Sequence, residues 1–319
     1  MMTLLEVDRL VKRYKVPGGV VNAVSDVSFT LDEGATLSLV GESGCGKSTT
    51  GRALLGIPGP DGGSIRLDGV DLARARPSEV AEARRKIQMI FQDARASLNP
   101  RRRVKDLVAE GLVIAGMARE EIHRRVDEVL VAVGLDPDQV GDRRADEFSG
   151  GQCQRVAIAR AMVMRPKILV CDEPVASLDV SVQAQVVNLL EDMKQEYGLS
   201  LLFISHDLAV VRSISDHVAV MYLGRIVEIG DAERVYTRPL HPYTRALLDS
   251  VPVPDPQRPS RGKALGGELP SPMNPPTGCP FRTRCPLAHE RCASETPRLR
   301  QVADGQRVAC HVAADGTAA

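Results

Sequence analysis

A short glycine-rich segment near the start of the chain holds residue types that bind nucleotide phosphates. Residues 41–49 read GESGCGKST and fit the pattern G-x-x-x-x-G-K-[ST]. Glycines let successive backbone N–H groups point at an anion, the lysine can reach the β- and γ-phosphates, and the next serine can ligate Mg²⁺. An ordinary glycine-rich turn is the alternative. The segment predicts a phosphate loop with nucleotide contacts from Gly41, Ser43, Gly44, Cys45, Gly46, Lys47, Ser48 and Thr49.

The flanking sequence predicts the elements that would position this loop. The apolar run at residues 36–40 is long enough for one buried strand, and residues 48–55 can form a helix. The N-terminus of that helix would add partial positive charge at the loop. The setting therefore favours nucleotide binding, although it does not say what the nucleotide drives.

Two later segments resemble motifs of the ABC-type ATPases. Residues 148–152 read FSGGQ and precede a helical run, which resembles the signature motif of that family. Residues 168–174 read ILVCDEP and resemble its Walker B strand. The resemblance implies an α/β fold: a P-loop NTPase (RecA-like) ABC ATPase core with an antiparallel β subdomain and a helical subdomain. It also implies ATP and Mg²⁺ as ligands.

The resemblance implies roles for residues that would otherwise be read as polar strand ends or ordinary packing. Asp172 would hold Mg²⁺ with Ser48, and Glu173 would polarise the water that attacks the γ-phosphate. Alternation along the strand sends these two carboxylates in different directions. Gln92, after the apolar run at residues 87–91, would be the Q-loop glutamine that touches Mg²⁺ and the attacking water. His206 would be the switch histidine that senses the γ-phosphate.

The remaining expected contacts concern adenine and a second chain. Tyr14 occupies the position of the aromatic ring that stacks on adenine in the family, although half-buried packing is the ordinary role of such a tyrosine. Asp179 would lie at the dimer seam, in the D-loop. The signature residues would face the γ-phosphate held by the opposite chain, so that each nucleotide site would be shared by two chains. These residues are Ser149, Gly150, Gly151 and Gln152.

Composition limits the possible partners and cellular compartments of the chain. The 319 residues carry 41 basic and 41 acidic side chains, which gives no general argument for nucleic acid or an anionic membrane as partner. No apolar run approaches membrane-spanning length and no signal peptide is visible, so we expect a soluble, intracellular chain that reaches a membrane only through partners. Seven cysteines, an odd number, point to a reducing compartment.

Periodicity and turn residues predict further elements. Short strands are expected at residues 4–7, 20–23 and 27–31, and a hairpin at residues 217–222 and 225–229. Residues 104–164 have a helical pattern with opposite charges three to four positions apart on one solvated face. From Pro239 to Pro276 prolines are frequent and periodicity is weak, which indicates an extended linker.

The C-terminal part resembles the extension of oligopeptide and dipeptide importer ATPases, through LHPYTRALL at residues 240–248 and the cysteine-containing tail. The resemblance implies an ATPase domain at residues 1–235, with its helical subdomain at about 93–165, and a small irregular extension at 236–319. Within that group the chain resembles the F-type subunit, which pairs with a D-type ATPase. The resemblance implies that such a subunit lies at the cytoplasmic face of the membrane, where it contacts two membrane permeases and acts indirectly with an extracytoplasmic binding protein. A nickel or oligosaccharide importer is the runner-up, and a soluble ABC ATPase of DNA repair or the ribosome is the competing class. The solute cannot be identified.

Four cysteines lie in the extension with the spacing C-x₅-C-x₆-C-x₁₇-C, at Cys279, Cys285, Cys292 and Cys310. A metal could supply folding energy that a proline-rich segment lacks, but this spacing does not choose the metal. Resemblance to some dipeptide importer ATPases implies a 4Fe-4S cluster; zinc with Cys310 or His311, and free thiols, are the alternatives. Losing one cysteine is expected to loosen the tail and leave nucleotide binding at Lys47 nearly unchanged.

Three residues depart from the family pattern without touching the expected catalytic set. Ala94 and Arg95 follow the Q-loop where a proline and a small or apolar residue are usual. Cys153 follows the signature where a basic residue is usual. Cys45, Cys153 and Cys171 are expected to be small fillers within the motifs.

Overall fold

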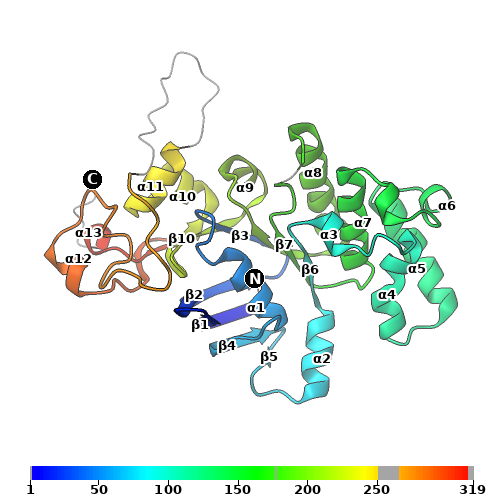
Figure 1. Ribbon diagram of the computed structural model, residues 1–319, viewed down its shortest axis with the longest axis horizontal. Coiled ribbons are helices and arrows are strands. Elements are labelled where there is room, and N and C mark those ends of the chain that lie inside the picture. Colours follow the sequence, from blue (N-terminus) through cyan, green and yellow to red (C-terminus); the bar gives the residue numbers. More distant parts are fainter. Residues whose placement is uncertain (1, 177, 251–265, 315–319) are drawn as a thin grey trace, which may run out of the picture. The chain divides into compact units, whose positions relative to one another are not determined.

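The computed structural model describes residues 2–176, 178–250 and 266–314, which form two compact units (Figure 1). The first unit contains Leu31–Ala35 and Leu67–Ile204 together with the residues up to Leu4. The second contains Leu5–Thr30, Thr36–Arg66 and the chain from Ser205 onward. The phosphate loop and His206 therefore belong to the second unit, while Gln92, the signature and the Walker B strand belong to the first.

The first unit has a parallel sheet whose strands are buried along almost their whole length. β7 (Ile168–Asp172) lies between β6 (Ile87–Ile90) and β8 (Ser200–Ile204), and every residue of β7 and β8 is buried. Helices on both faces of a parallel sheet require such continuous apolar runs. The helices of this part of the unit are α2 (Pro77–Arg85), α7 (Gly150–Met162) and α8 (Val180–Tyr197).

A helical region lies between β6 and β7 along the chain, as the sequence pattern predicts. It contains α3 (Ala94–Ser97), α4 (Val104–Ile114), α5 (Arg119–Ala132), α6 (Pro137–Val140) and the 3₁₀ turn η1 (Ala145–Glu147). Val104, Leu107 and Val108 are buried at helical spacing, which explains why α4 packs on its neighbours. Gly116 and Gly134 follow α4 and α5 with φ of 73° each, a conformation that favours glycine, so the pattern divides into separate helices.

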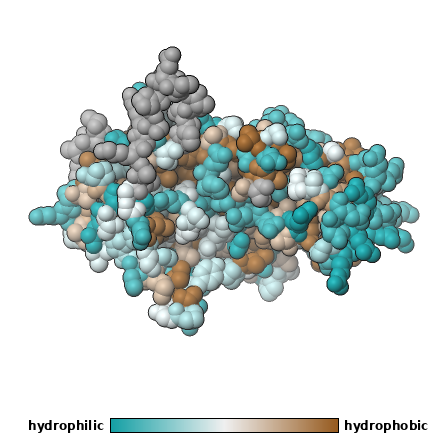
Figure 2. Space-filling view, turned by 45° about the horizontal axis from the view of Figure 1, so that its top comes forward, coloured by the Kyte–Doolittle hydropathy of each residue, from teal (hydrophilic) through white to brown (hydrophobic). Residues whose placement is uncertain are grey.

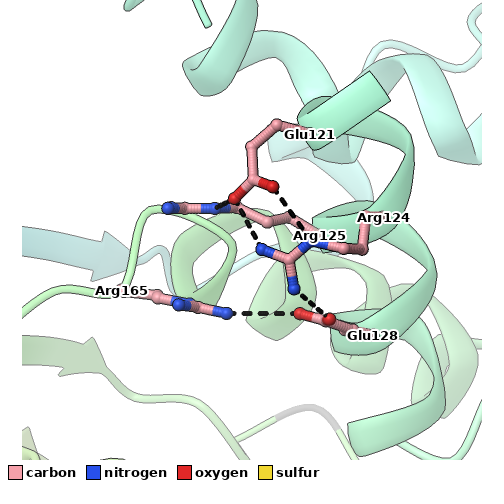
Figure 3. Close-up of polar contacts among 5 residues, drawn as sticks. All are labelled: Glu121, Arg124, Arg125, Glu128 and Arg165. Atoms are coloured by element: carbon pink, nitrogen blue, oxygen red, sulfur yellow. Dashed lines mark hydrogen bonds and ion pairs between the residues drawn. The ribbon is translucent and has the colours of Figure 1, made fainter. Parts of the chain in front are cut away.

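The charges predicted on a solvated helix face form a network on α5 (Figure 3). Arg124 donates to Glu121 and to Glu128, and Arg125 donates to Glu121. Hydrogen bonds from Arg124 and Arg125 lower the pKa of Glu121 to about 2. Arg165, in the segment between α7 and β7, donates to Glu128 at 3.2 Å and links that segment to α5. Hydrophilic residues also predominate at this end of the unit in Figure 2.

The antiparallel part of the second unit has longer strands than the sequence predicts. β1 (Thr3–Val16) and β2 (Gly19–Asp32) are neighbours, and β4 (Gly62–Leu67) borders β1. The strands predicted at residues 20–23 and 27–31 are one strand, because β2 continues through residues 24–26. Arg9 in β1 and Asp26 in β2 take φ of 47° and 65°, so the backbone departs locally from regular strand geometry without ending either strand.

A second sheet of this unit joins segments far apart in sequence. Its strands lie in the order β11 (Arg300–Ala303), β12 (Gln306–Val308), β10 (Arg225–Asp231), β9 (His217–Tyr222) and β3 (Thr36–Val40). β3 runs parallel to β9, and β9 and β10 form the predicted hairpin. The other elements of this unit are α1 (Lys47–Leu55), α9 (Leu208–Ile214), α10 (Ala232–Thr237), α11 (Pro242–Asp249), α12 (Glu290–Ser294) and α13 (His311–Ala314).

The extension is less irregular than expected, because β12 pairs with β10 and lengthens this sheet. Glu228, which is buried on β10, helps to hold the extension against this sheet. Its carboxylate accepts hydrogen bonds from the backbone of Leu240 and His241 and from the Gln306 side chain, all within 2.8 Å. Burial raises the pKa of Glu228, so these donors stabilise a charge that would otherwise be costly in the core.

Within residues 2–176, 178–250 and 266–314, no helix combines the length and apolar composition needed to cross a bilayer.

Candidate functional site

Two glycines of the phosphate loop, Gly41 and Gly46, lie where neighbouring backbone leaves no room for a side chain. A Cβ at Gly41 would lie 2.2 Å from the Met221 carbonyl oxygen, and one at Gly46 would lie 2.3 Å from that of Ala23. Gly46 also takes φ of 108° at the residue preceding α1. The loop therefore lies against neighbouring backbone, with the N-terminus of α1 directly after it, as an anion site requires.

Lys47 is held by the loop itself in this structure. Its side chain is buried, and its ammonium donates to the carbonyl of Gly41 at 2.8 Å and to that of Glu42 at 3.1 Å. A phosphate oxygen is a stronger acceptor than a carbonyl, so a bound nucleotide can take over these donors. Cys45 is buried beneath the loop, and burial raises the pKa of its thiol, which fits a filler better than a reactive group.

The Walker B strand delivers two carboxylates to different environments. Asp172 is the last residue of β7 and is completely buried. Glu173 follows with φ of 48°, a backbone conformation that costs a residue with a side chain about 1–3 kcal/mol. Its N–H donates to the Ile204 carbonyl at 2.9 Å. Such strain concentrates at functional sites.

The structure brings Gln92 and Glu173 together. The Gln92 amide donates to a carboxylate oxygen of Glu173 at 3.0 Å, although the two residues are 81 positions apart. Gln92 follows β6, which is the strand next to β7, so their ends meet at one edge of the sheet. Two residues expected to act on the attacking water thus lie in direct contact.

The signature begins a well-capped helix. The Ser149 hydroxyl accepts from the Gln152 N–H at 3.3 Å, and the Gln152 side chain accepts from the Ser149 N–H at 3.1 Å. This capping box leaves Ser149 and Gly150 exposed at the N-terminus of α7. A Cβ at Gly151 would lie 2.9 Å from a Val182 methyl carbon. Backbone N–H groups and the helix dipole at this end can bind an anion presented from outside.

The residues that depart from the family pattern support the signature. Arg95 donates to the Phe148 carbonyl at 2.8 Å, which links the segment after Gln92 to the residue before Ser149. Cys153 is buried, with its sulfur 3.6 Å from the Ala145 carbonyl, where a longer basic side chain would not fit without rearrangement. Sequence reasoning gave Arg95 no role, because its contact is 53 positions away.

The other expected site residues belong to different elements of the chain. His206 is exposed two positions after the end of β8, and Asp207 caps α9 by accepting from the Ala209 N–H at 2.8 Å. Tyr14 is half-buried on β1, and the Lys12 ammonium lies 5.6 Å from its ring centroid. Asp179 is exposed at the residue preceding α8. Their roles stay predictions.

The extension contains four free cysteines, and the N–H of Cys279 donates to the carbonyl of Cys292 at 2.8 Å. Burial, with repulsion from charge on Cys292, Cys285 and Cys310, raises the pKa of Cys279 to about 11. Burial also raises the pKa of Cys285 and that of Cys310. None of the four is in a disulfide. However, no group of three or more His, Cys, Asp or Glu in the described parts of the chain is arranged to hold a metal ion, so neither the cluster nor zinc has support from the structure.

Two family models match the chain. The model described as ABC transporter matches residues 24–176, which include the phosphate loop and the Walker B strand. The model described as oligopeptide/dipeptide transporter, C-terminal region, matches residues 227–292.

Relatives extend these matches over almost the whole chain. A probable peptide ABC transporter ATP-binding protein of Sinorhizobium fredii is 48% identical and covers 99% of this chain and 92% of its own length. The oligopeptide transport ATP-binding protein OppF of Escherichia coli is 52% identical over 89% of this chain and 86% of its own. Among solved structures, cbiO1 of Clostridium perfringens, part of an ABC transporter complex, has a TM-score of 0.65 at 31% identity and covers 75% of this chain and 92% of its own. The chain belongs to the ABC transporter ATP-binding proteins, in the group that carries the oligopeptide/dipeptide transporter C-terminal region.

Proposed function

We propose that this chain is the ATP-hydrolysing subunit that powers import of di- and oligopeptides through an ABC transporter. The observation that carries the proposal is the joint match of the ATPase region and the peptide-transporter extension in one chain. Relatives named for peptide or oligopeptide transport support it over most of their length. A nickel or oligosaccharide importer of the same subfamily is the second candidate, because the solute never touches this subunit.

Different residues would carry separate steps of ATP hydrolysis. Glu173 accepts the proton of the attacking water, and Gln92, hydrogen-bonded to Glu173 at 3.0 Å, orients both. Lys47 and the N-terminus of α1 bind the β- and γ-phosphates. Oxygen ligands suit Mg²⁺, and the family resemblance assigns them to Ser48, Asp172 and Gln92. When bound, Mg²⁺ neutralises charge on the transferred phosphoryl group.

We further propose that each nucleotide site is shared by two chains. The exposed Ser149–Gly150 end of α7 would face a nucleotide held by the second ATPase, and Asp179 would lie at the seam. A dimeric ATP-binding cassette bound to ADP and Pi supports this; it is 27% identical, with a TM-score of 0.64, and covers 72% of this chain and 98% of its own. The proposed partners are a D-type ATPase, two permeases and, indirectly, a peptide-binding protein, at the cytoplasmic face of the membrane and without nucleic acid.

The proposed domains are residues 1–235 for the ATPase, with the helical subdomain at about 93–165, and residues 236–319 for the extension. The helices from α3 to α7 fall within the proposed helical subdomain. The pairing of β12 with β10 attaches the extension to the ATPase sheet, so the proposed boundary separates two parts that share one sheet.

Reconstitution tests this function. The chain would be assembled with the proposed permeases and second ATPase, in vesicles with the binding protein enclosed and the ATPases outside. We expect peptide-loaded binding protein to stimulate ATP hydrolysis and peptide to move from the vesicle interior to the ATPase side. Stimulation by nickel or an oligosaccharide instead would favour the second candidate. A chain that does not assemble with permeases would favour a soluble ABC ATPase.

An iron–sulfur cluster at the four cysteines remains a prediction from the family resemblance. Four free thiols in one segment support it, two of them joined by the backbone hydrogen bond from Cys279 to Cys292, whereas the described part of the chain contains no arrangement suited to a metal ion. We expect protein prepared without oxygen to be brown, with about four iron and four sulfide per chain. Cys285→Ser should bleach it, whereas Cys153→Ser should not. Colourless protein with stoichiometric zinc would assign zinc, and metal-free protein would leave free thiols.

A further inference from the structure

Glu42, the second residue of the phosphate loop, is bound by two side chains from the C-terminal part of the chain. Arg284 donates to both carboxylate oxygens of Glu42, at 2.7 and 3.0 Å. The Tyr243 hydroxyl oxygen accepts from the Glu42 N–H at 2.9 Å. The remaining polar group, the Glu42 carbonyl, accepts from Lys47. We call Glu42, Tyr243 and Arg284 the Glu42 cluster.

The ion pair of the Glu42 cluster is shielded from solvent. The side chain of Arg284 is 4% exposed and that of Glu42 is 28% exposed. The guanidinium also lies 5.9 Å from the ring centroid of Tyr222, and its bonds to Glu42 raise the pKa of Arg284. A bidentate pair of this kind fixes orientation as well as distance, unlike an exposed surface pair.

Aromatic packing holds both partners of Glu42 in place. Phe281, three residues before Arg284, lies 5.2 Å from Tyr222 and 5.4 Å from Tyr243 between ring centroids. Tyr222 and Tyr243 are themselves 4.7 Å apart. All three rings are essentially buried, so the strand β9, the helix α11 and the extension present a preformed surface to the loop.

We propose that Tyr243 and Arg284 are positioning residues for the phosphate loop, so that nucleotide affinity depends on the C-terminal extension. A glycine-rich loop loses conformational freedom when it binds phosphate, and holding Glu42 in place lowers that cost before the nucleotide arrives. Lys47 benefits directly, because Glu42 supplies one of the carbonyls that hold its ammonium. The proposal rests on nucleotide binding at this loop.

This arrangement changes one expectation from the sequence. Arg284 immediately precedes Cys285, and Phe281 follows Cys279 by two positions. A change that disorders the cysteine segment would therefore release Glu42. Loss of a cysteine is expected to weaken ATP binding, where sequence alone predicts no effect.

The test measures binding of a fluorescent ATP analogue to the full-length chain. Arg284→Ala is expected to weaken binding about tenfold, and Tyr243→Phe, which removes only the hydroxyl and keeps the ring, about threefold. Arg282→Ala is the matched control, since Arg282 bonds Thr277 in the same segment and not the loop. Its affinity should equal that of the unmodified chain.

Three further measurements separate positioning from a general loss of stability. Arg284→Ala should add nothing in a Glu42→Gln background that already lacks the ion pair, and the exchange Glu42→Arg with Arg284→Glu should restore part of the affinity. In the assembled transporter, Arg284→Ala should raise the KM for ATP and leave kcat near its original value. Arg284→Ala is expected to unfold at a lower temperature than Arg282→Ala, because it removes one partner of a shielded ion pair, so binding is compared at a temperature at which both variants are folded.

Unchanged affinity in Arg284→Ala would overturn the proposal, as would equal losses in Arg284→Ala and Arg282→Ala. Lys47→Ala serves as the reference for nucleotide binding. If Lys47→Ala loses affinity and Arg284→Ala does not, the positioning role fails while the loop assignment stands. If neither variant loses affinity, the loop assignment itself fails.

Discussion

Glu173→Gln is expected to slow ATP hydrolysis by about 10²–10⁴-fold, the usual contribution of a general base, while ATP binding persists. The amide occupies the same space as the carboxylate but cannot accept a proton at neutral pH. Its oxygen can still accept from Gln92, which now donates to Glu173 at 3.0 Å, so the local geometry should survive. The variant should accumulate as an ATP-bound dimer with its partner.

The measurement for Glu173→Gln uses the assembled transporter, with phosphate release for turnover and size-exclusion chromatography for the dimer. Glu120→Gln is the matched control, because it makes the same chemical change on the exposed start of α5. Wild-type turnover by Glu173→Gln would exclude Glu173 as the base. Equal slowing by both variants would indicate a nonspecific effect.

Lys47→Ala is expected to weaken ATP binding by about 10²-fold, since two hydrogen bonds to charged phosphate oxygens contribute roughly 1.5–3 kcal/mol each, less the desolvation of a buried ammonium. The ammonium is already inside the loop, within 3.1 Å of two carbonyl oxygens, so it needs only a short movement to reach a phosphate. Binding of a fluorescent ATP analogue to the isolated chain measures the loss. Affinity close to that of the unmodified chain would remove Lys47 from the site.

Ser149→Arg is the informative comparison, because the composite-site proposal predicts an opposite result. The isolated chain should bind ATP normally, since the signature would act on a nucleotide held by the other chain, whereas hydrolysis in the assembled transporter should fall. Ser149→Ala loses only the helix cap, which costs about 1 kcal/mol of stability, and so shows how much of the effect of Ser149→Arg comes from the bulk of the arginine at the shared site. Weaker ATP binding by isolated Ser149→Arg would contradict a shared site.

Local pattern predicted the elements that carry the chemistry. The apolar run of β3 ends directly before Gly41, which begins the phosphate loop, and β7 ends at Asp172, so strand ends and motif residues coincide along the chain. The phosphate loop needs glycine where neighbouring backbone lies within 2.3 Å of a hypothetical Cβ, and that requirement is visible as a glycine pattern. The capping box at Ser149 and Gln152 is likewise a contact over three positions.

Contacts between distant segments carried no such signal. The Arg284–Glu42 pair spans 242 positions and the Gln306–Glu228 pair spans 78, and neither residue type announces burial. β12 is three residues long, too short for alternation to show, and its pairing depends on the edge offered by β10. The pattern predicted short strands at residues 4–7, 20–23 and 27–31, but tertiary packing extends them into the longer strands β1 and β2.

The sheet of the second unit joins strands that are synthesised at very different times. Thr36, at the start of β3, hydrogen-bonds Asp216, which is 180 positions later in the chain. At about 5–20 residues per second, roughly 9–36 s pass between their synthesis. During that interval β3, whose five residues are all buried in the finished fold, has no partner strand of its own unit. The nascent polypeptide therefore carries an unpaired apolar strand through most of translation, so its yield in the cell should depend on chaperones that cover such segments at the ribosome.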